Sequence, residues 1–436
     1  MYKLISRFIS SKDGNVAVLL SLSFFALFLA MGTAIDVKSM HKNREDLQRI
    51  SDAAALAAVN YQGTTEEKKV AFQDFLERFA EQTGYENDIV TTTLDINENS
   101  QTVSLSTNLT SPHELSFLSG IYGTQKLGVS SSVVAGNEDI EVVLVIDISS
   151  SMAGARLTEA KKSAEFFVKE VLSNQPINGT VSVSLVPFGG TVRVPKELSY
   201  LLQSPSEGIE EYSKYWIDEE WNQCFEYTIQ QVKDGISVDG SYKVTPDFYS
   251  WHRTNPWCPR AGNEFIPLTD DAEKLTETIE DLSLSDGTGS DHGMMWAYEN
   301  LNSVWKDKLP GGLENTPAEF RQSTKKIIVF MTDGGITAQH YLRDQYMTGS
   351  PIYFSRRKVL ISLNNTLSAY HSICDKAKAD DIEIYTIGYN LRRTSQETQL
   401  RECATSNSHY LDAFSGNLES VFRNIAAAIS PIRISS

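Results

Sequence analysis

A carboxylate and two hydroxyls follow one strongly apolar stretch of the sequence. Residues 142–146 read VVLVI, and Asp147, Ser149 and Ser151 come directly after them at alternate positions. A run of β-branched and aliphatic residues is typical of a strand buried on both faces of a parallel sheet. Open α/β sheets bind ligands at the carboxyl ends of such strands, and Mg²⁺ or Mn²⁺ prefers hard oxygen donors. The stretch predicts a divalent-metal site; the alternative is that the same Asp and Ser residues only cap the next helix.

A second buried stretch also ends in a carboxylate. Residues 326–332 read KIIVFMT, and Asp333 and two glycines follow. Between the two stretches, residues 286–293 form a glycine-rich loop, DGTGSDHG, that carries a hydroxyl at Thr288. Because parallel strands end at the same edge of a sheet, we expect Asp333 to lie near the first cluster.

Strands and helices alternate through residues 139–436, which we expect to form one main domain. This order predicts an α/β fold, with a doubly wound and mostly parallel sheet covered by helices on both faces. The expected strands, besides the one that ends at Asp147, are 180–188, 326–332, 382–387 and 409–411, and the expected helices are 156–172, 270–282, 291–305, 363–379 and 418–429.

A long insert interrupts this alternation at about residues 197–264. It has no regular period and holds four of the six tryptophans, and a stretch of this length is usually functional or a small subdomain. Its aromatic residues either form exposed stacking platforms or fill a small core. They are Tyr212, Tyr215, Trp216, Trp221, Tyr249, Trp251 and Trp257. A second interruption, 335–357, directly follows a strand end.

The four cysteines all lie in the main domain, at positions 224, 258, 374 and 403. An even count in an exported region permits two disulfides in three possible pairings. We expect Cys224 to pair with Cys258 inside the insert, and Cys374 to pair with Cys403; four buried thiols are the alternative. No CxxC motif is present, which argues against a zinc site.

The N-terminus carries a membrane-anchor pattern. No charged residue lies between Asp13 and Asp36, and residues 15–36 have the length and apolarity of one membrane span. Three basic residues precede it, so we expect residues 1–14 to be cytoplasmic and the remainder to be exported. A cleaved signal peptide is the alternative, but the apolar run is long and leads directly into a further helix.

Residues 37–137 read as a small α+β module between the anchor and the main domain. Helical spacing continues from the anchor to about residue 61, and a second helical pattern covers 65–83. Residues 89–108 then alternate apolar and polar side chains around asparagine-rich turns, which indicates a β-hairpin, and 127–135 read as a further strand.

Composition and motifs argue against two function classes. The formal net charge of −17 opposes binding to a nucleic-acid backbone. Neither GxSxG nor HExxH occurs, and no basic clamp for a phosphate lies near either carboxylate. We therefore expect a protein that is not an enzyme and does not bind nucleic acid.

The DxSxS motif, the loop threonine and the later TDG motif resemble the metal-ion-dependent adhesion site (MIDAS) of von Willebrand factor type A domains. The resemblance implies that Ser149 and Ser151 coordinate Mg²⁺ or Mn²⁺ directly, and that Asp147 and Asp333 act directly or through water. The resemblance also implies that Thr288 of the loop joins when a ligand binds, with Ser290 as the alternative loop ligand. One coordination position is then left for an acidic side chain of a protein partner.

The N-terminal part resembles TadE/TadG-like proteins of tight-adherence (Flp) pilus assembly. A short basic tip, a single span and the sequence AIDVKSMHKNREDLQRISDAAALAA carry this likeness, and the C-terminal LESVFRNIAAAISPIRIS and the pairing of Cys374 with Cys403 also fit the group. The glutamate of pilin-like members is absent from the span. The resemblance implies a single-pass protein of the bacterial inner membrane, with a periplasmic main domain that binds pilus assembly or secretion components. The alternative is a surface adhesin or sensor that binds an external ligand through the aromatic insert.

Overall fold

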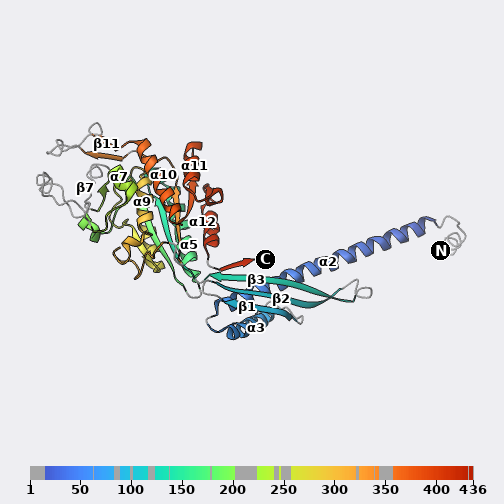
Figure 1. Cartoon of the computed structure of the whole chain (residues 1–436). Coiled ribbons are helices and arrows are strands. Elements are labelled where there is room, and N and C mark those ends of the chain that lie inside the picture. The colour runs from blue at the N-terminus through green and yellow to red at the C-terminus, as the bar shows by residue number, and fades with distance from the viewer. Residues whose placement is uncertain are drawn as a thin grey trace. The chain divides into compact units, whose positions relative to one another are not determined.

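The structure is a computed structural model, and its helices and strands are shown in Figure 1. It describes residues 15–61, 63–82, 89–98, 102–115, 123–136, 138–176, 179–201, 223–239, 245–246, 257–320, 324–337, 339–342, 357–430 and 432–435. Two compact units make up the chain: an anchor unit, Met1–Asn137 with Ile432–Ser436, and a main unit, Glu138–Pro431.

The main unit is built on a six-stranded sheet with the order β13-β12-β9-β4-β5-β8. Its strands are β4 (Asp139–Asp147), β5 (Val181–Phe188), β8 (Ile266–Thr269), β9 (Thr324–Thr332), β12 (Glu383–Tyr389) and β13 (Tyr410–Ala413). All neighbours pair in parallel except β8, which runs antiparallel to β5. Numbered along the chain, the order across the sheet is 3-2-1-4-5-6, which is a doubly wound sheet. The predicted fold class is confirmed.

Helices cover both faces of this sheet (Figure 1). Val142, Leu144 and Ile146 of β4 pack in one apolar core with α5 (Ala155–Ser173), α8 (Ala272–Asp281) and α12 (Leu418–Ile429). Val143 and Val145 belong to the other core, with α7 (Ile229–Asp234), α9 (Ser290–Glu299), α10 (Leu363–Ala379) and α11 (Thr394–Cys403). Side chains of a strand alternate between faces, so the unbroken apolar run of β4 supplies both cores.

The structure corrects three expectations for the main unit. The predicted helix 291–305 ends early, because α9 stops at Glu299 and a separate 3₁₀ turn, Ser303–Trp305, starts where the Asn302 side chain accepts from the Val304 amide. The interruption at 335–357 contains an antiparallel pair, β10 (Gln339–Leu342) and β11 (Arg357–Ile361). Both β8 and α11 were missed, since β8 is only four residues long and α11 is mostly polar.

The insert contains short elements in its described part. These are a 3₁₀ turn (Lys196–Leu201), β6 (Phe225–Glu226), α7 and β7 (Thr245–Pro246), and β6 pairs with β7. Trp257 is 5% exposed and is therefore not an exposed stacking platform. The other aromatic residues named for the insert, at positions 212, 215, 216, 221, 249 and 251, lie outside the described residues.

Both predicted disulfides are present. Cys224 is bonded to Cys258 at the base of the insert, and Cys374 of α10 is bonded to Cys403 at the end of α11. The alternative of four free thiols is wrong.

The anchor unit combines a long helix with a four-stranded sheet. Helix α2 (Asn15–Asn60) packs on α3 (Thr65–Gln82) and on the sheet β1-β2-β3-β14. The strands are β1 (Val90–Glu98), β2 (Thr102–Glu114), β3 (Thr124–Gly136) and β14 (Ile432–Ser435), all antiparallel. The structure thus places the last strand in the anchor unit, whereas we expected the main domain to reach residue 436. The reason is the backbone pairing of β14 with β3, which the local sequence pattern does not predict.

The two halves of α2 have different surroundings within the anchor unit. Leu47, Ile50 and Ala54 are buried, whereas Leu19 and Phe25 are each 64% exposed. Among the described residues, α2 is the one helix that is long and apolar enough to cross a membrane. Its unbroken course confirms the predicted continuation of the span as a single helix, and its exposed apolar half fits a membrane anchor.

Candidate metal centre

The two carboxylates lie at the point where the strand order reverses. Asp147 is the last residue of β4 and Asp333 directly follows β9, and these two strands are neighbours with Ile146 opposite Met331. In the order 3-2-1-4-5-6, strands 1 and 4 meet at the topological switch point, outside which doubly wound sheets bind their ligands. The sheet order therefore brings together two residues that are far apart in the sequence.

Hydrogen bonds connect four of the five predicted metal ligands. The Ser149 amide donates to Asp147 Oδ1 at 2.7 Å, and Ser149 Oγ and Ser151 Oγ lie 2.8 Å apart. Ser151 Oγ donates to Asp333 Oδ1 at 2.6 Å. Asp147 and Ser149 are buried and Ser151 is exposed, so the cluster is accessible to solvent at Ser151.

The donor set of this cluster fits a small hard cation. All its side-chain donors are oxygens, from two carboxylates and two hydroxyls. An octahedral ion with ligands at about 2.0–2.1 Å holds neighbouring ligand oxygens about 2.9 Å apart. The two hydroxyls, at 2.8 Å, and Ser151 Oγ with Asp333 Oδ1, at 2.6 Å, are close to that spacing.

Asp147 is in a position that favours a cation. Burial and the neighbouring carboxylate of Asp333 raise the pKa of Asp147 to about 6, against the hydrogen bonds from Ser149 and Thr332. Thr332 Oγ1 donates to Asp147 Oδ2 at 2.6 Å, so both carboxylate oxygens have a donor. A bound cation would stabilise the ionised form that burial disfavours.

The helix-cap alternative is not what the structure contains. The N-cap of α5 is Gly154, and the short 3₁₀ helix Ser150–Met152 has Ser149 at its N-cap without a side-chain cap bond. Instead, Asp147 Oδ1 accepts from the Ser149 amide, the hydroxyls of Ser149 and Ser151 bond to each other, and Ser151 Oγ donates to Asp333.

The glycine-rich loop lies beside the cluster. The Ser285 amide donates to the Ile148 carbonyl at 2.8 Å, and Ser150 Oγ donates to Asp286 Oδ1 at 3.0 Å. Thr288 is bonded through its backbone to Thr337.

No hydrogen bond among the described residues connects Thr288 to the cluster, so its role as a fifth ligand stays a prediction. The alternative ligand, Ser290, is in the first turn of α9, and its Oγ is buried without a partner in the described part of the chain. Both remain candidates for the loop ligand.

Trp257 packs between the two loops at this edge of the sheet. A Cβ on Gly190 would lie 2.1 Å from its ring and one on Gly287 would lie 2.5 Å from it, so only glycine leaves room for the indole. The Trp257 carbonyl accepts from the Gly190 amide at 3.1 Å and from Ser285 Oγ at 3.0 Å. The base of the insert thus supports the loop that carries Thr288.

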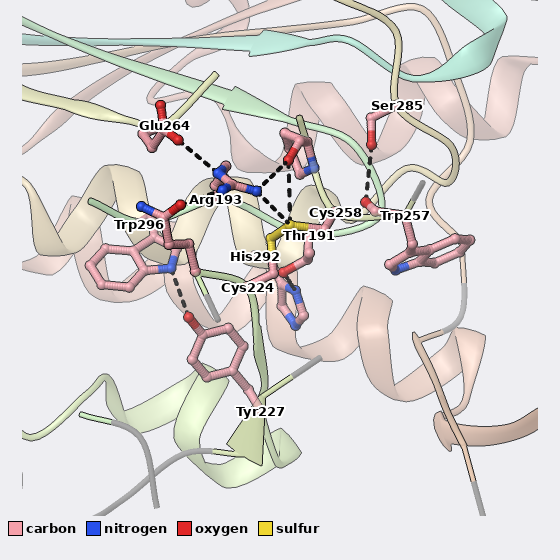
Figure 2. The surroundings of a disulfide bond; sticks show 12 residues. Thr191, Arg193, Cys224, Tyr227, Trp257, Cys258, Glu264, Ser285, His292 and Trp296 are labelled. Carbon is pink, nitrogen blue, oxygen red and sulfur yellow. Dashed lines mark hydrogen bonds and ion pairs between the residues drawn. A yellow bond between two sulfur atoms is a disulfide. The ribbon is translucent and has the colours of Figure 1, made fainter. Parts of the chain in front are cut away.

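Figure 2 shows what fixes Trp257 in place. Its neighbour Cys258 forms the disulfide with Cys224, and the buried side chain of Arg193 lies against Cys258. Arg193 donates to Glu264 Oε1 at 2.7 Å, to the Pro259 carbonyl at 3.3 Å and to the Gln223 side chain. Arg193, just before the insert, is therefore hydrogen-bonded to the end of the insert at Pro259 and Glu264.

Three residues at the site were missed by sequence reasoning. Thr332 bonds to Asp147, Trp257 supports the loop, and Arg156 donates to Asp333 Oδ2 at 2.5 Å. The position of Thr332 directly before Asp333 was a usable signal, because a residue that ends the same strand lies at the same sheet edge. Nothing local distinguishes Arg156 from other basic residues at the start of a helix.

Three solved structures show how far likeness to known proteins extends. The von Willebrand factor domain of the type V pili tip protein Mfa5 from Porphyromonas gingivalis is 17% identical with a TM-score of 0.38, covering 67% of this chain and 95% of that one. The pilus adhesin SpaC from Lactobacillus rhamnosus GG is 13% identical with a TM-score of 0.39, covering 78% and 34%. The proximal thread matrix protein 1 from the mussel byssus, with a zinc-occupied MIDAS motif, is 15% identical with a TM-score of 0.33, covering 66% and 48%. The chain thus spans about a third of SpaC and about half of the mussel protein.

A search of curated proteins found no match. Residues 14–60 match the model of a family described as "Putative Flp pilus-assembly TadE/G-like". This segment covers the apolar half of α2 and its continuation into the anchor unit. Residues 14–60 are therefore similar to TadE/G-like Flp pilus-assembly proteins, and the main unit has the doubly wound sheet that the sequence predicts.

Proposed function

We propose that this chain is a membrane-anchored, pilus-associated protein whose main unit binds a protein partner through Mg²⁺ or Mn²⁺. Asp147, Ser149, Ser151 and Asp333 would hold the ion, and it would supply a Lewis-acidic position for an acidic side chain of the partner. The observation that carries this proposal is the meeting of these four oxygen-bearing side chains at the switch point of the sheet. Binding, and not catalysis, is the proposed role.

The N-terminal apolar helix indicates where in the cell this binding would occur. We propose that α2 spans the bacterial inner membrane once, with residues 1–14 in the cytoplasm and the main unit in the periplasm. The basic residues before the span support this orientation, and the two disulfides support an oxidising compartment. The partner would be a component of pilus assembly or secretion, as the family match of the N-terminal segment suggests.

A pull-down tests the binding function. The full-length chain, solubilised in detergent, is expected to retain a partner from a membrane extract in Mg²⁺ and to release it in EDTA. The variant Asp147→Asn is expected to retain little in either condition, while Asp412→Asn, which removes an exposed carboxylate of β13, is expected to behave as wild type. A partner that stays bound equally in Mg²⁺ and EDTA would show that the interaction does not use the metal.

Reporter fusions test the orientation. A reporter that is active only after export, fused after residue 436, is expected to be active, and a reporter that is active only in the cytoplasm is expected to be silent there. The same two reporters fused after residue 12 should give the opposite pattern. Activity of the cytoplasmic reporter at the C-terminus would overturn the proposed topology.

The adhesin alternative depends on the aromatic insert. Trp257, which would have been one of its stacking platforms, is buried against the loops of the metal cluster. This favours a structural role for the base of the insert, and metal-dependent binding is therefore the function that the described residues support best.

A further inference from the structure

Arg156 is the basic side chain of the candidate metal cluster. Its Nη1 donates to Asp333 Oδ2 at 2.5 Å and to the Ser151 carbonyl at 3.2 Å. Ser151 Oγ donates to the other oxygen of the same carboxylate at 2.6 Å. Both oxygens of Asp333 are therefore bonded to donors from the turn before α5 and from the first turn of α5.

This ion pair changes the charge that an entering cation would meet. The Asp333 side chain is fully buried, at 0% exposed, and that of Arg156 is 26% exposed. Two ionised carboxylates, Asp147 and Asp333, would give the cluster two negative charges, and Arg156 leaves a net charge of minus one. A divalent cation held by the cluster would also lie close to the guanidinium, and like charges a few ångströms apart repel strongly where water is excluded.

The rest of the guanidinium is available to a ligand. An arginine has five N–H donors, and in the described part of the chain the Nε and Nη2 of Arg156 donate to no residue. A planar fork of this kind matches a carboxylate in a bidentate geometry. Because the side chain is partly exposed, a carboxylate that reaches the metal position from solvent can also reach this fork.

We propose that Arg156 keeps the divalent-cation affinity of the cluster low in the absence of a partner, and that it binds the partner's carboxylate beside the metal. The proposal rests on the proposed function, since it requires the cluster to bind metal. A cluster that neutralises only half of the ion's charge attracts a further carboxylate, and the guanidinium attracts the same group. Metal and acidic partner then bind with positive coupling, and by linkage each raises the affinity for the other.

The first test compares Mn²⁺ affinity in full-length variants, solubilised in detergent and followed by the electron paramagnetic resonance of free Mn²⁺. Arg156→Gln removes the repulsion and is expected to bind Mn²⁺ about tenfold or more tightly than wild type. Arg156→Lys keeps the positive charge and is expected to stay near wild type. The matched control is Arg423→Gln, which removes the same charge from an exposed pair with Glu419 on α12 and should leave the affinity unchanged.

A second readout is thermal unfolding. Without metal, Arg156→Gln is expected to melt below wild type, because the buried Asp333 carboxylate loses its cation. Saturating Mg²⁺ replaces that charge, so the rise in melting temperature on adding Mg²⁺ should be larger in Arg156→Gln than in wild type. A role of Arg156 in packing alone predicts lower melting temperatures with and without metal, and no gain in affinity.

Acetate serves as the carboxylate probe. At equal ionic strength, replacing chloride by acetate is expected to tighten Mn²⁺ binding in wild type and in Arg423→Gln, and to have a smaller effect in Arg156→Gln. An equal effect in all three proteins would overturn the carboxylate contact.

Mn²⁺ affinity that is unchanged or weaker in Arg156→Gln would overturn the first half of the proposal while leaving the proposed function intact. Absence of Mn²⁺ binding in wild type would overturn both.

Discussion

Asp147→Asn is expected to abolish the rise in melting temperature that Mg²⁺ gives the wild-type protein. Asp147 is a fully buried carboxylate of the cluster, and its Oδ1 and Oδ2 accept from Ser149 and Thr332. A ligand at about 100 times its dissociation constant stabilises a folded protein by about 2.7 kcal/mol, and the variant should lose nearly all of this. Asparagine keeps the shape of the side chain, so the fold should be retained.

Differential scanning calorimetry of the full-length protein, with and without Mg²⁺, measures this effect. Asp412→Asn is the matched control, because it removes a carboxylate from β13 at the surface, and it should keep the full response to Mg²⁺. An equal Mg²⁺ response in wild type and Asp147→Asn would show that the ion binds elsewhere.

In the absence of metal, the stability of Asp147→Asn relative to wild type is expected to depend on pH. The pKa of Asp147 is raised to about 6 in the folded protein, by burial and by the neighbouring Asp333, from about 3.9 in an unfolded chain. A raised folded-state pKa means that the unfolded state releases this proton first, so ionisation of Asp147 destabilises the fold as the pH rises from about 4 to about 6. Above that range, ionisation of Asp147 lowers the free energy of unfolding by about 3 kcal/mol. Metal-free Asp147→Asn should therefore gain stability relative to wild type between pH 4 and pH 7, and a constant difference would contradict the assignment.

Lys326→Met is expected to destabilise the main unit by about 3–5 kcal/mol, the typical cost of leaving one member of a buried ion pair without its partner. Lys326 Nζ donates to Glu141 Oε2 at 2.7 Å, and both side chains are nearly fully buried. It also donates to the carbonyls of Leu301 and Ala318. Burial lowers the pKa of Lys326, and the carboxylate of Glu141 opposes this shift.

Urea-induced unfolding of the metal-free protein measures the loss. The matched control is the neighbouring Lys325→Met, which breaks a partly exposed pair with Glu383 and should cost less than about 1 kcal/mol. The double variant Glu141→Gln/Lys326→Met removes both charges and should recover a large part of the stability. Similar small losses in the two single variants would mean that water reaches Glu141.

Sequence patterns were sufficient for the elements that position the site. The apolar runs 142–146 and 326–332 predicted the two central strands. The carboxyl ends of these strands lie where expected, one at Asp147 and the other directly before Asp333. The helices α10 and α12 have the predicted bounds. These elements were predictable because burial on one or both faces leaves a period in the local sequence.

Elements whose stability comes from distant partners were not predictable in the same way. β8 and β14 are short edge strands that are fixed by pairing with β5 and β3, and β14 returns the end of the chain to the anchor unit. Four residues leave little room for a period, although β13, of equal length, was predicted at 409–411. Hydrogen bonds between backbones do not determine the order of side chains along the sequence.

By itself, the sequence determined the α/β class, the apolar N-terminal helix and the oxygen-bearing side chains that follow each central strand. The tertiary structure alone decided that β4 and β9 are neighbours, that Arg156 pairs with Asp333, and that Trp257 supports the glycine-rich loop. The physical reason is the range of the interactions. Side-chain burial acts residue by residue along a strand or helix, whereas the charge and the shape of the cluster depend on contacts between residues such as Arg156 and Asp333, 177 positions apart.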